Sequence, residues 1–207
     1  MSERAQIEWK RVICRQPGRY IGWPTIARTS QGELVAVFSG DRDDHICPWG
    51  KTELVRSSDD GESWSDPVTI RDTPLDDRDA GIIQTSRGTL VVSWFTSVAF
   101  ENRPEFPQRA GWQQRAAELT AADRERWLGR WTHRSEDGGV TWDDPVRTVG
   151  SAPHGPIQLR DGRLLYLGTG FMDGERIMGA EESSDDGRSW QLIGSAPLPA
   201  TMTHGLG

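Results

Sequence analysis

Apolar residues in this chain occur in short runs that are separated by polar turns containing Gly. Three runs begin directly after such a turn, at 34–38, 90–94 and 164–167. They are too short for ordinary helices and rich in Val, Leu and aromatic residues, which favours buried strands. A second extended, apolar segment precedes each turn, at 23–27, 80–84 and 155–159. The pattern therefore predicts an all-β chain.

A polar motif follows each of these hairpins and occurs three times. It has the form Ser-x-Asp-x-Gly-x-Ser/Thr-Trp, at 57–64, 135–142 and 183–190. An Asp side chain accepts hydrogen bonds from turn amides, Gly adopts positive φ, and a Trp ring can cover the turn. Extended residues flank each copy. We therefore predict a self-contained turn between two strands.

Together, these segments predict a unit of four antiparallel strands that is repeated along the chain. The first Gly and the motif Gly lie 29 residues apart in the first unit, 25 in the third and 51 in the second. Four-stranded units of about 50 residues in tandem indicate a β-propeller, because one blade cannot bury both faces alone. The predicted parts of this single partial domain are blade 1 at about 20–74, blade 2 at 75–150, blade 3 at 151–200 and the start of a fourth blade at 201–207.

The longer spacing in the second unit indicates an insertion at about 101–130. Thr120 and Asp123 resemble a capping box, so we expect one or two short helices. The insertion is either a surface decoration or a lid over a central site. In the second case Trp112, Trp127 or Trp131 would face a ligand.

Charge and composition restrict the partners. The 207-residue chain has a net charge of −7, so neither nucleic acid nor an anionic membrane is an expected partner. The first 18 residues lack the apolar core of a signal peptide, and no apolar run has the length of a membrane span, so a cytoplasmic location is expected. Cys14 and Cys47 are expected to be free thiols. No spacing typical of a metal or cofactor site is present.

Candidate chemistry lies where the first strands and their connecting loops would converge on a propeller axis. The acidic segments 41–45 and 76–79 each contain an Arg, and His154 and His204 lie at corresponding points of later units. Carboxylates, Arg and His are the groups that glycoside hydrolysis uses. The alternatives are a solvated turn at 76–79, His residues that satisfy backbone groups, and core packing for Trp23.

The three polar motifs resemble the Asp-boxes (BNR repeats) of the sialidase, or neuraminidase, superfamily. The resemblance covers residues from about 20 to 207 and implies a sialidase-like propeller of about six blades, of which about three, apparently the N-terminal half, are present. In that family the boxes lie in outer strands, away from substrate. The ring would then be completed by a longer chain or by pairing of half-propellers in a homo-oligomer.

The resemblance extends to only some functional residues. The family has an Arg before Ile-Pro on its first inner strand, and the matching position here is Gly22, followed by Trp23. Its acid/base Asp lies after the second strand, beside an Arg. The resemblance therefore implies Asp41, Asp43 or Asp44 as the acid and Arg42 as that Arg. The remaining Arg residues, the Tyr nucleophile and its Glu belong to later blades.

The predicted function is sialidase-like exo-glycosidase activity on a terminal sugar of a glycan, with an acidic and a neutral sugar as the two alternatives. The chain by itself is expected to be an incomplete and inactive portion. The alternatives are a non-catalytic propeller that binds carbohydrate or protein, and a scaffold in a larger assembly. The predicted substrate-binding residues are Trp23, Arg42, His45, Asp77, Arg78, Asp79, His154 and His204.

Overall fold

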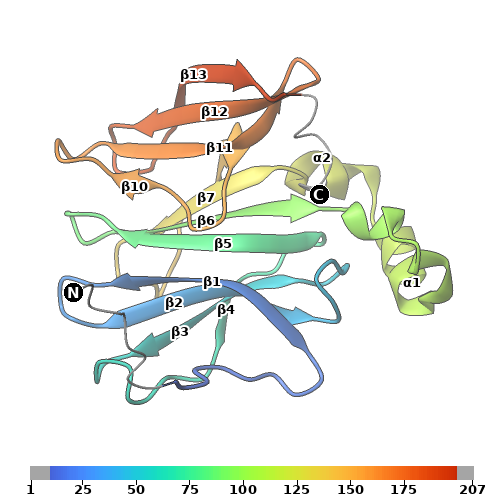
Figure 1. The fold of residues 1–207 in the computed structure, drawn as a ribbon, viewed down its shortest axis with the longest axis horizontal. Coiled ribbons are helices and arrows are strands. Elements are labelled where there is room, and N and C mark those ends of the chain that lie inside the picture. Colours follow the sequence, from blue (N-terminus) through green and yellow to red (C-terminus); the bar gives the residue numbers. More distant parts are fainter. Residues whose placement is uncertain (1–9, 200–207) are drawn as a thin grey trace, which may run out of the picture.

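The computed structural model describes residues 10–199, which form three antiparallel sheets packed side by side (Figure 1). The first sheet contains β1 (Tyr20–Arg28), β2 (Leu34–Arg42), β3 (Lys51–Ser57) and β4 (Val68–Arg71). The second contains β5 (Asp76–Gln84), β6 (Leu90–Ser97), β7 (Arg130–Ser135) and β8 (Val146–Thr148). The third contains β9 (Gly150–Ser151), β10 (Ile157–Gln158), β11 (Leu164–Met172), β12 (Glu175–Ser183) and β13 (Gln191–Pro197).

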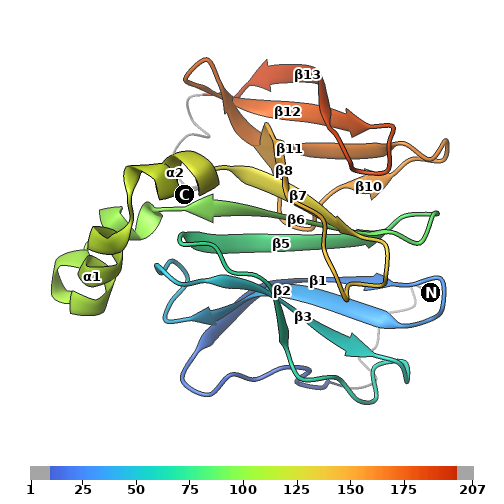
Figure 2. The ribbon, with the colours of Figure 1, turned by 180° about the vertical axis from the view of Figure 1, so that it is seen from behind.

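The strand order within each sheet follows the chain, and this confirms the predicted all-β fold of four-stranded antiparallel blades. The orders are β1-β2-β3-β4, β5-β6-β7-β8 and β10-β11-β12-β13, with the short β9 also paired to β11. Figure 2 shows the same stack from behind, with the second sheet between the other two. The arrangement is that of successive blades in part of a β-propeller.

The first two sheets share a core because β2 is apolar on both faces. Val35 and Val37 belong to a buried cluster that also contains Ile82 of β5 and Leu90 of β6. On the opposite face of β2, Phe38 packs in a second cluster with Ala36, Val55 and, at its edge, Ile13 and Trp64. A strand buried on both faces appears in the sequence as a continuous apolar run, which is the pattern of 34–38.

The turns after the third strand of each sheet share one hydrogen-bond pattern. The hydroxyl of the first Ser donates to the motif Asp at 2.8 Å in each turn and accepts from the Gly N–H at 2.6–2.8 Å. The motif Gly residues have φ of 84–90°. In the first turn the Trp64 indole donates to the Gly61 carbonyl at 3.1 Å, and in the third the Trp190 indole donates to Thr132 of the second sheet at 2.8 Å. Each turn is therefore closed mainly by its own side chains.

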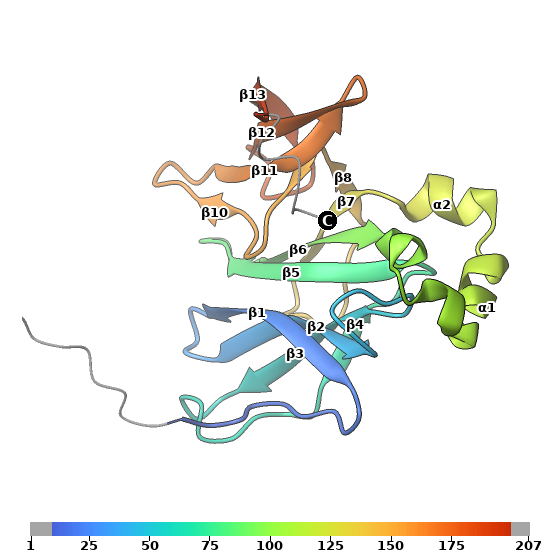
Figure 3. The same cartoon turned by 45° about the vertical axis from the view of Figure 1, so that its right-hand side comes forward.

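The insertion between β6 and β7 is helical, as its sequence predicts. It contains the 3-10 helices η1 (Ala99–Asn102) and η2 (Phe106–Gln108) and the α-helices α1 (Ala110–Glu118) and α2 (Ala121–Trp127). Thr120 and Asp123 form the expected capping box. Figure 3 shows the helices projecting to one side of the sheets. Trp112 is only 2% exposed, since it packs in a separate apolar cluster with Ile46, Cys47 and Phe100.

The outward face of the third sheet exposes large apolar side chains. Leu167 of β11 is 53% exposed and Met178 of β12 is 42% exposed, whereas Val37, at the position of β2 that corresponds to Leu167, is fully buried. This face therefore has the composition of a sheet that packs against another. Among the described residues no helix is long and apolar enough to cross a membrane.

The turn pattern predicts that loss of one Ser hydroxyl destabilises the fold. Ser57→Ala leaves the buried Gly61 N–H without its acceptor, so we expect the free energy of unfolding to fall by about 1–3 kcal/mol. Urea denaturation measures this change. Ser58→Ala is the matched control, because Ser58 is exposed in the same turn. Equal stability of the two variants would contradict the assigned role of the hydroxyl.

His133 predicts a loss of stability in mild acid. Its ring lies between Trp94 and Trp142, at 4.7 and 4.4 Å, and is 1% exposed. Burial, aided by Arg71, lowers the pKa of His133 to about 3. The unfolded chain binds a proton below about pH 6.5, so stability from this residue is complete above that pH and decreases toward pH 3.

We expect a slope of up to about 1.4 kcal/mol per pH unit from His133. His133→Phe removes the titrating group, so its free energy of unfolding should decrease less between pH 6.5 and 4.5 than that of the wild type. Chemical denaturation across this range measures the difference. Parallel curves for the two proteins would show that His133 is not buried in its neutral form.

Candidate active site

The first strand or entry segment of each sheet contains one residue with an uncommon backbone conformation at a corresponding point. Trp23, Asp79 and His154 have φ of 51°, 52° and 79°, although none is Gly. In β1 and β5 the pairing register shifts across this residue, as in a β-bulge. Bulges redirect side chains and are common beside functional sites. The three residues therefore mark one common region of the three sheets.

The three sheets meet closely at this region. The His154 ring Nδ1 lies 2.8 Å from Thr25 Oγ1, which joins the third sheet to the first. A Cβ atom on Gly81 would overlap the backbone of Gly155, so β5 and the entry to β10 approach through two Gly residues. Since backbone approaches this close exclude a side chain, Gly81 and Gly155 are required at these positions.

A pocket of about 440 Å³ opens at this meeting point, and all three sheets contribute to it. Its charged side chains are one carboxylate, three guanidinium groups and one imidazole, and its aromatic side chains are one indole and two phenyl rings. The lining residues are Trp23, His45, Arg78, Asp79, Phe95, Arg130, Ser151, Pro153, Thr169, Phe171 and Arg176. We call this the axial pocket.

Asp79 is the carboxylate of the axial pocket. Its backbone N–H donates to Ser39 Oγ at 2.9 Å, and its Oδ1 is buried without a hydrogen-bond partner among the described residues. Burial raises the pKa of Asp79, and the nearby Arg78 only partly opposes this rise. A half-buried carboxyl with a raised pKa has the character of a general acid.

Arg78 lies beside Asp79 and forms the floor of the axial pocket. Its side chain is 2% exposed, and its guanidinium lies 5.8 Å from the Trp23 ring and 5.2 Å from the Phe95 ring. Its Nη2 lies 3.5 Å from His45 Nε2, while its Nη1 has no hydrogen-bond partner among the described residues. Partial burial is the main cause that lowers the pKa of His45, and the charge of Arg78 is the second. His45 is therefore mainly neutral at pH 7.

A buried ion pair beneath the pocket connects the first two sheets. Arg42, at the end of β2, and Asp76, at the start of β5, are both 0% exposed, and Arg42 Nη2 lies 2.9 Å from Asp76 Oδ2. Arg42 also donates to the carbonyl oxygens of Asp77 and His45, each at 3.0 Å. Burial raises the pKa of Asp76 to about 6, although Arg42 acts against the rise. Arg42 therefore fixes the backbone of His45 and of Asp77, which precedes Arg78 and Asp79 of the pocket.

The structure brings together four of the predicted site residues, Trp23, His45, Arg78 and Asp79, in the axial pocket. His154 does not line the pocket, although it follows the lining residue Pro153 in the chain and contacts Thr25. Arg42 and Asp77 lie beneath the surface, where Asp77 accepts hydrogen bonds from Thr73 N at 2.6 Å and Thr73 Oγ1 at 3.1 Å. The solvated-turn alternative for 76–79 is therefore wrong. His204 lies outside the described residues.

The three Asp residues predicted as acids do not line the axial pocket. Asp41 pairs with Arg19 and Lys51, each at 2.9 Å. Asp43 accepts from the Trp112 indole at 3.1 Å, and Asp44 pairs with Arg109 at 3.4 Å. The reason is that the helical insertion supplies donors to Asp43 and Asp44, whereas Asp41 is held by Arg19 and Lys51, which lie outside the insertion. The position of the insertion was not apparent from the sequence.

Seven residues of the axial pocket are not among the predicted site residues, and the four with aromatic or charged side chains are Phe95, Arg130, Phe171 and Arg176. Arg130 donates from Nε to the Thr169 carbonyl at 3.1 Å, and its guanidinium lies 5.4 Å from the Phe171 ring. The Arg176 guanidinium lies 6.0 Å from the same ring. All four lie at the ends of strands β6, β7, β11 and β12. None of the four adjoins the predicted axial segments in the chain, so no local signal in the sequence marks them.

No metal site is evident in residues 10–199, since they contain no group of three or more His, Cys, Asp or Glu side chains placed to hold an ion. The axial pocket itself presents one carboxyl with a raised pKa, a neutral imidazole, cationic guanidinium groups and aromatic faces. This set can bind an anionic or hydroxylated ligand and donate a proton to it.

No family model and no curated protein matches the chain. Solved structures do match. A protein of unknown function from Dyadobacter fermentans DSM 18053 has a TM-score of 0.67 and 19% identity, over 91% of this chain and 58% of that one. A leech intramolecular trans-sialidase has a TM-score of 0.65 and 12% identity, over 93% and 46%. An α-L-arabinanase from Penicillium chrysogenum has a TM-score of 0.52 and 15% identity, over 90% and 52%.

The chain thus spans about half the length of the structures that it matches. At such low identity, the likeness establishes the fold and not the activity. The chain has the fold of part of a sialidase-like β-propeller.

Proposed function

We propose that this chain contributes to the active site of a sialidase-like glycoside hydrolase that removes a terminal sugar, and that Asp79 is its general acid. The observation that carries the proposal is the half-buried Asp79 carboxyl, which has a raised pKa and one oxygen without a partner among the described residues. It lies in the axial pocket of a fold that sialidases and an arabinanase share.

In the proposed reaction, the protonated Asp79 donates its proton to the glycosidic oxygen while the bond from that oxygen to the anomeric carbon breaks. Glycosidases also need a nucleophile or a base on the other side of the sugar. Asp79 is the one carboxylate that lines the pocket within the described residues. The proposal therefore includes a second catalytic group on a further sheet that completes the ring.

The charges of the pocket support an acidic sugar as substrate. The pocket has three positively charged guanidinium groups, those of Arg78, Arg130 and Arg176, and one carboxylate, that of Asp79. Guanidinium groups bind carboxylates well. A Cβ on Gly22 would lie 2.9 Å from Tyr20 Cε1, so the position at which sialidases are expected to have an Arg is occupied by the Tyr20 ring. The carboxylate of the sugar would then bind on the side of Arg130 and Arg176.

A second candidate function is a propeller that binds carbohydrate without catalysis. The observation in its favour is that Asp41, Asp43 and Asp44 are all held by cations or by an indole N–H. For either function, the apolar outward face of the third sheet supports a propeller ring that further sheets complete. These sheets would belong to a longer chain or to a second copy of this chain in a homo-oligomer.

The catalytic proposal predicts that Asp79→Asn abolishes most activity and that Asp41→Asn does not. The longest protein that contains this sequence should be assayed with 4-methylumbelliferyl glycosides of sialic acid, glucuronic acid and L-arabinofuranose. We expect kcat/KM for the cleaved substrate to fall by about 10²–10⁴-fold in Asp79→Asn and by less than about twofold in Asp41→Asn. Wild-type activity should also fall as the pH rises through the pKa of Asp79, because the protonated form is required.

Two results would reject this assignment. If Asp41→Asn loses as much activity as Asp79→Asn, the acid lies in the 41–45 loop. If the wild type hydrolyses none of the glycosides but retains one of the corresponding free sugars in equilibrium dialysis, the binding function replaces the catalytic one.

A further inference from the structure

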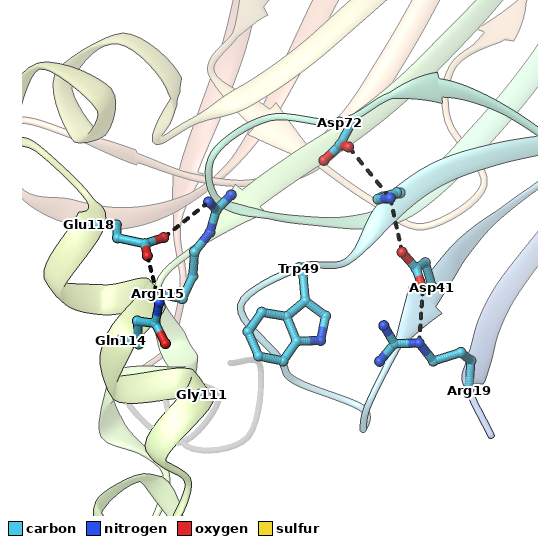
Figure 4. A pocket seen from close by; sticks show the side chains of 9 residues that line it. Arg19, Asp41, Trp49, Asp72, Gly111, Gln114, Arg115 and Glu118 are labelled. Atoms are coloured by element: carbon cyan, nitrogen blue, oxygen red, sulfur yellow. Dashed lines mark hydrogen bonds and ion pairs between the residues drawn. The ribbon is translucent and has the colours of Figure 1, made fainter.

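A second pocket, of about 530 Å³, lies between the first sheet and helix α1. Figure 4 shows the Trp49 indole in its middle, with the helix on one side and the Asp41–Arg19 pair on the other. One wall consists of Arg19, Asp41, Lys51 and Asp72, and the other of Gly111, Gln114, Arg115 and Glu118. We call this the helix pocket. It shares no lining residue with the axial pocket.

The charges of the helix pocket are balanced and arranged in pairs. Asp41 lies 2.9 Å from Lys51 Nζ, and Lys51 in turn lies 3.6 Å from Asp72. On the helix, Arg115 and Glu118 are 3.9 Å apart. Together with Arg19, three cations face three carboxylates, so the pocket has no net charge to attract an anion or a cation. The paired groups retain N–H donors and oxygen lone pairs, which suit hydroxyl groups because a hydroxyl both donates and accepts.

Two donors of the pocket lack an acceptor. Trp49 Nε1 and Arg115 Nε are buried and have no hydrogen-bond partner among the described residues. A buried donor without a partner costs free energy, so both N–H groups call for an acceptor. Both side chains line the helix pocket, so a polar molecule bound there is one source of the missing acceptors.

Trp49 also supplies an apolar surface. Its indole packs at the edge of the cluster of Ile46, Cys47, Phe100 and Trp112, and its Cη2 would lie 3.4 Å from a Cβ on Gly111. A pocket with one aromatic face and a few polar groups at its rim is typical of sites for small polar ligands. The C–H face of a sugar ring packs on an indole in this way, while its hydroxyls meet the polar walls.

We propose that the helix pocket is a binding site for a neutral saccharide unit, separate from the axial pocket. The 41–45 loop lies between the two sites: Asp43 and Asp44 contact α1, whereas His45 lines the axial pocket. The site goes beyond the proposed hydrolase function and does not depend on it, because none of its residues takes part in the proposed reaction.

Saturation-transfer difference NMR of the chain with galactose, glucose, mannose and N-acetylglucosamine tests this proposal. We expect at least one of these sugars to receive saturation, with affinity about tenfold weaker in Trp49→Ala, since one aromatic contact is lost. Trp49→Ala removes packing as well, so Gly111→Leu is the second variant: it fills the pocket and leaves Trp49 in place. Circular dichroism checks that both variants fold, and Trp127→Ala is the control for loss of a Trp that does not line the helix pocket.

Binding that is weakened about tenfold in Trp49→Ala and lost in Gly111→Leu, but kept in Asp79→Asn and Trp127→Ala, supports the site. The proposal is overturned if none of the four sugars binds, if binding persists in Gly111→Leu, or if Asp79→Asn abolishes it. The last result would assign the sugar to the axial pocket. Failure of Asp79→Asn to lose hydrolysis would reject the proposed catalytic acid without affecting this site.

Discussion

The ion pair between Arg42 and Asp76 is the constraint on which the rest of the site depends. Both side chains are fully buried. Arg42 is the last residue of β2 and Asp76 is the first residue of β5, and both strands lead to residues of the axial pocket. An unpaired charge in this environment is costly, so the two sheets are held at the separation that allows the pair to form. Arg42 also binds the His45 and Asp77 carbonyls, and Asp76 accepts from Cys47 N at 3.4 Å. One interaction thus fixes the 42–47 loop and the start of β5, from which Arg78 and Asp79 follow.

Each of the three sheets has a Ser-Asp-Gly turn at its outer edge and a residue with positive φ near the axial pocket. The turns are alike in the three sheets, whereas the residues with positive φ differ. At the rim, each Ser-Asp-Gly turn closes on itself and leaves little polarity for a ligand. At the centre, a residue with positive φ in each sheet is directed toward a common region, and that residue is Trp23, Asp79 or His154. The repeated sequence therefore builds the scaffold, while the residues that differ between repeats supply the chemistry.

Local features were predictable from the sequence, because they depend on neighbours in the chain. The strand runs, the polar turns and the capping box of Thr120 all form as expected. The candidate site was predictable in part: Trp23, His45, Arg78 and Asp79 meet in one pocket. Asp41, Asp43 and Asp44 lie outside that pocket because they are directed by contacts with residues up to 69 positions away, such as Trp112. Arg130 and Arg176 were not predicted as site residues, because only the packing of the second sheet against the third brings them together.

The central claim, that the Arg42–Asp76 pair holds the first two sheets together, is tested most directly by a double-mutant cycle. The free energies of unfolding of Arg42→Met, Asp76→Leu and the double variant should be measured in urea at pH 7. The account predicts that each single change costs about 3–5 kcal/mol and that the double change costs at least about 1 kcal/mol less than their sum, since no buried charge is left alone. Costs that add to within about 0.5 kcal/mol would contradict it.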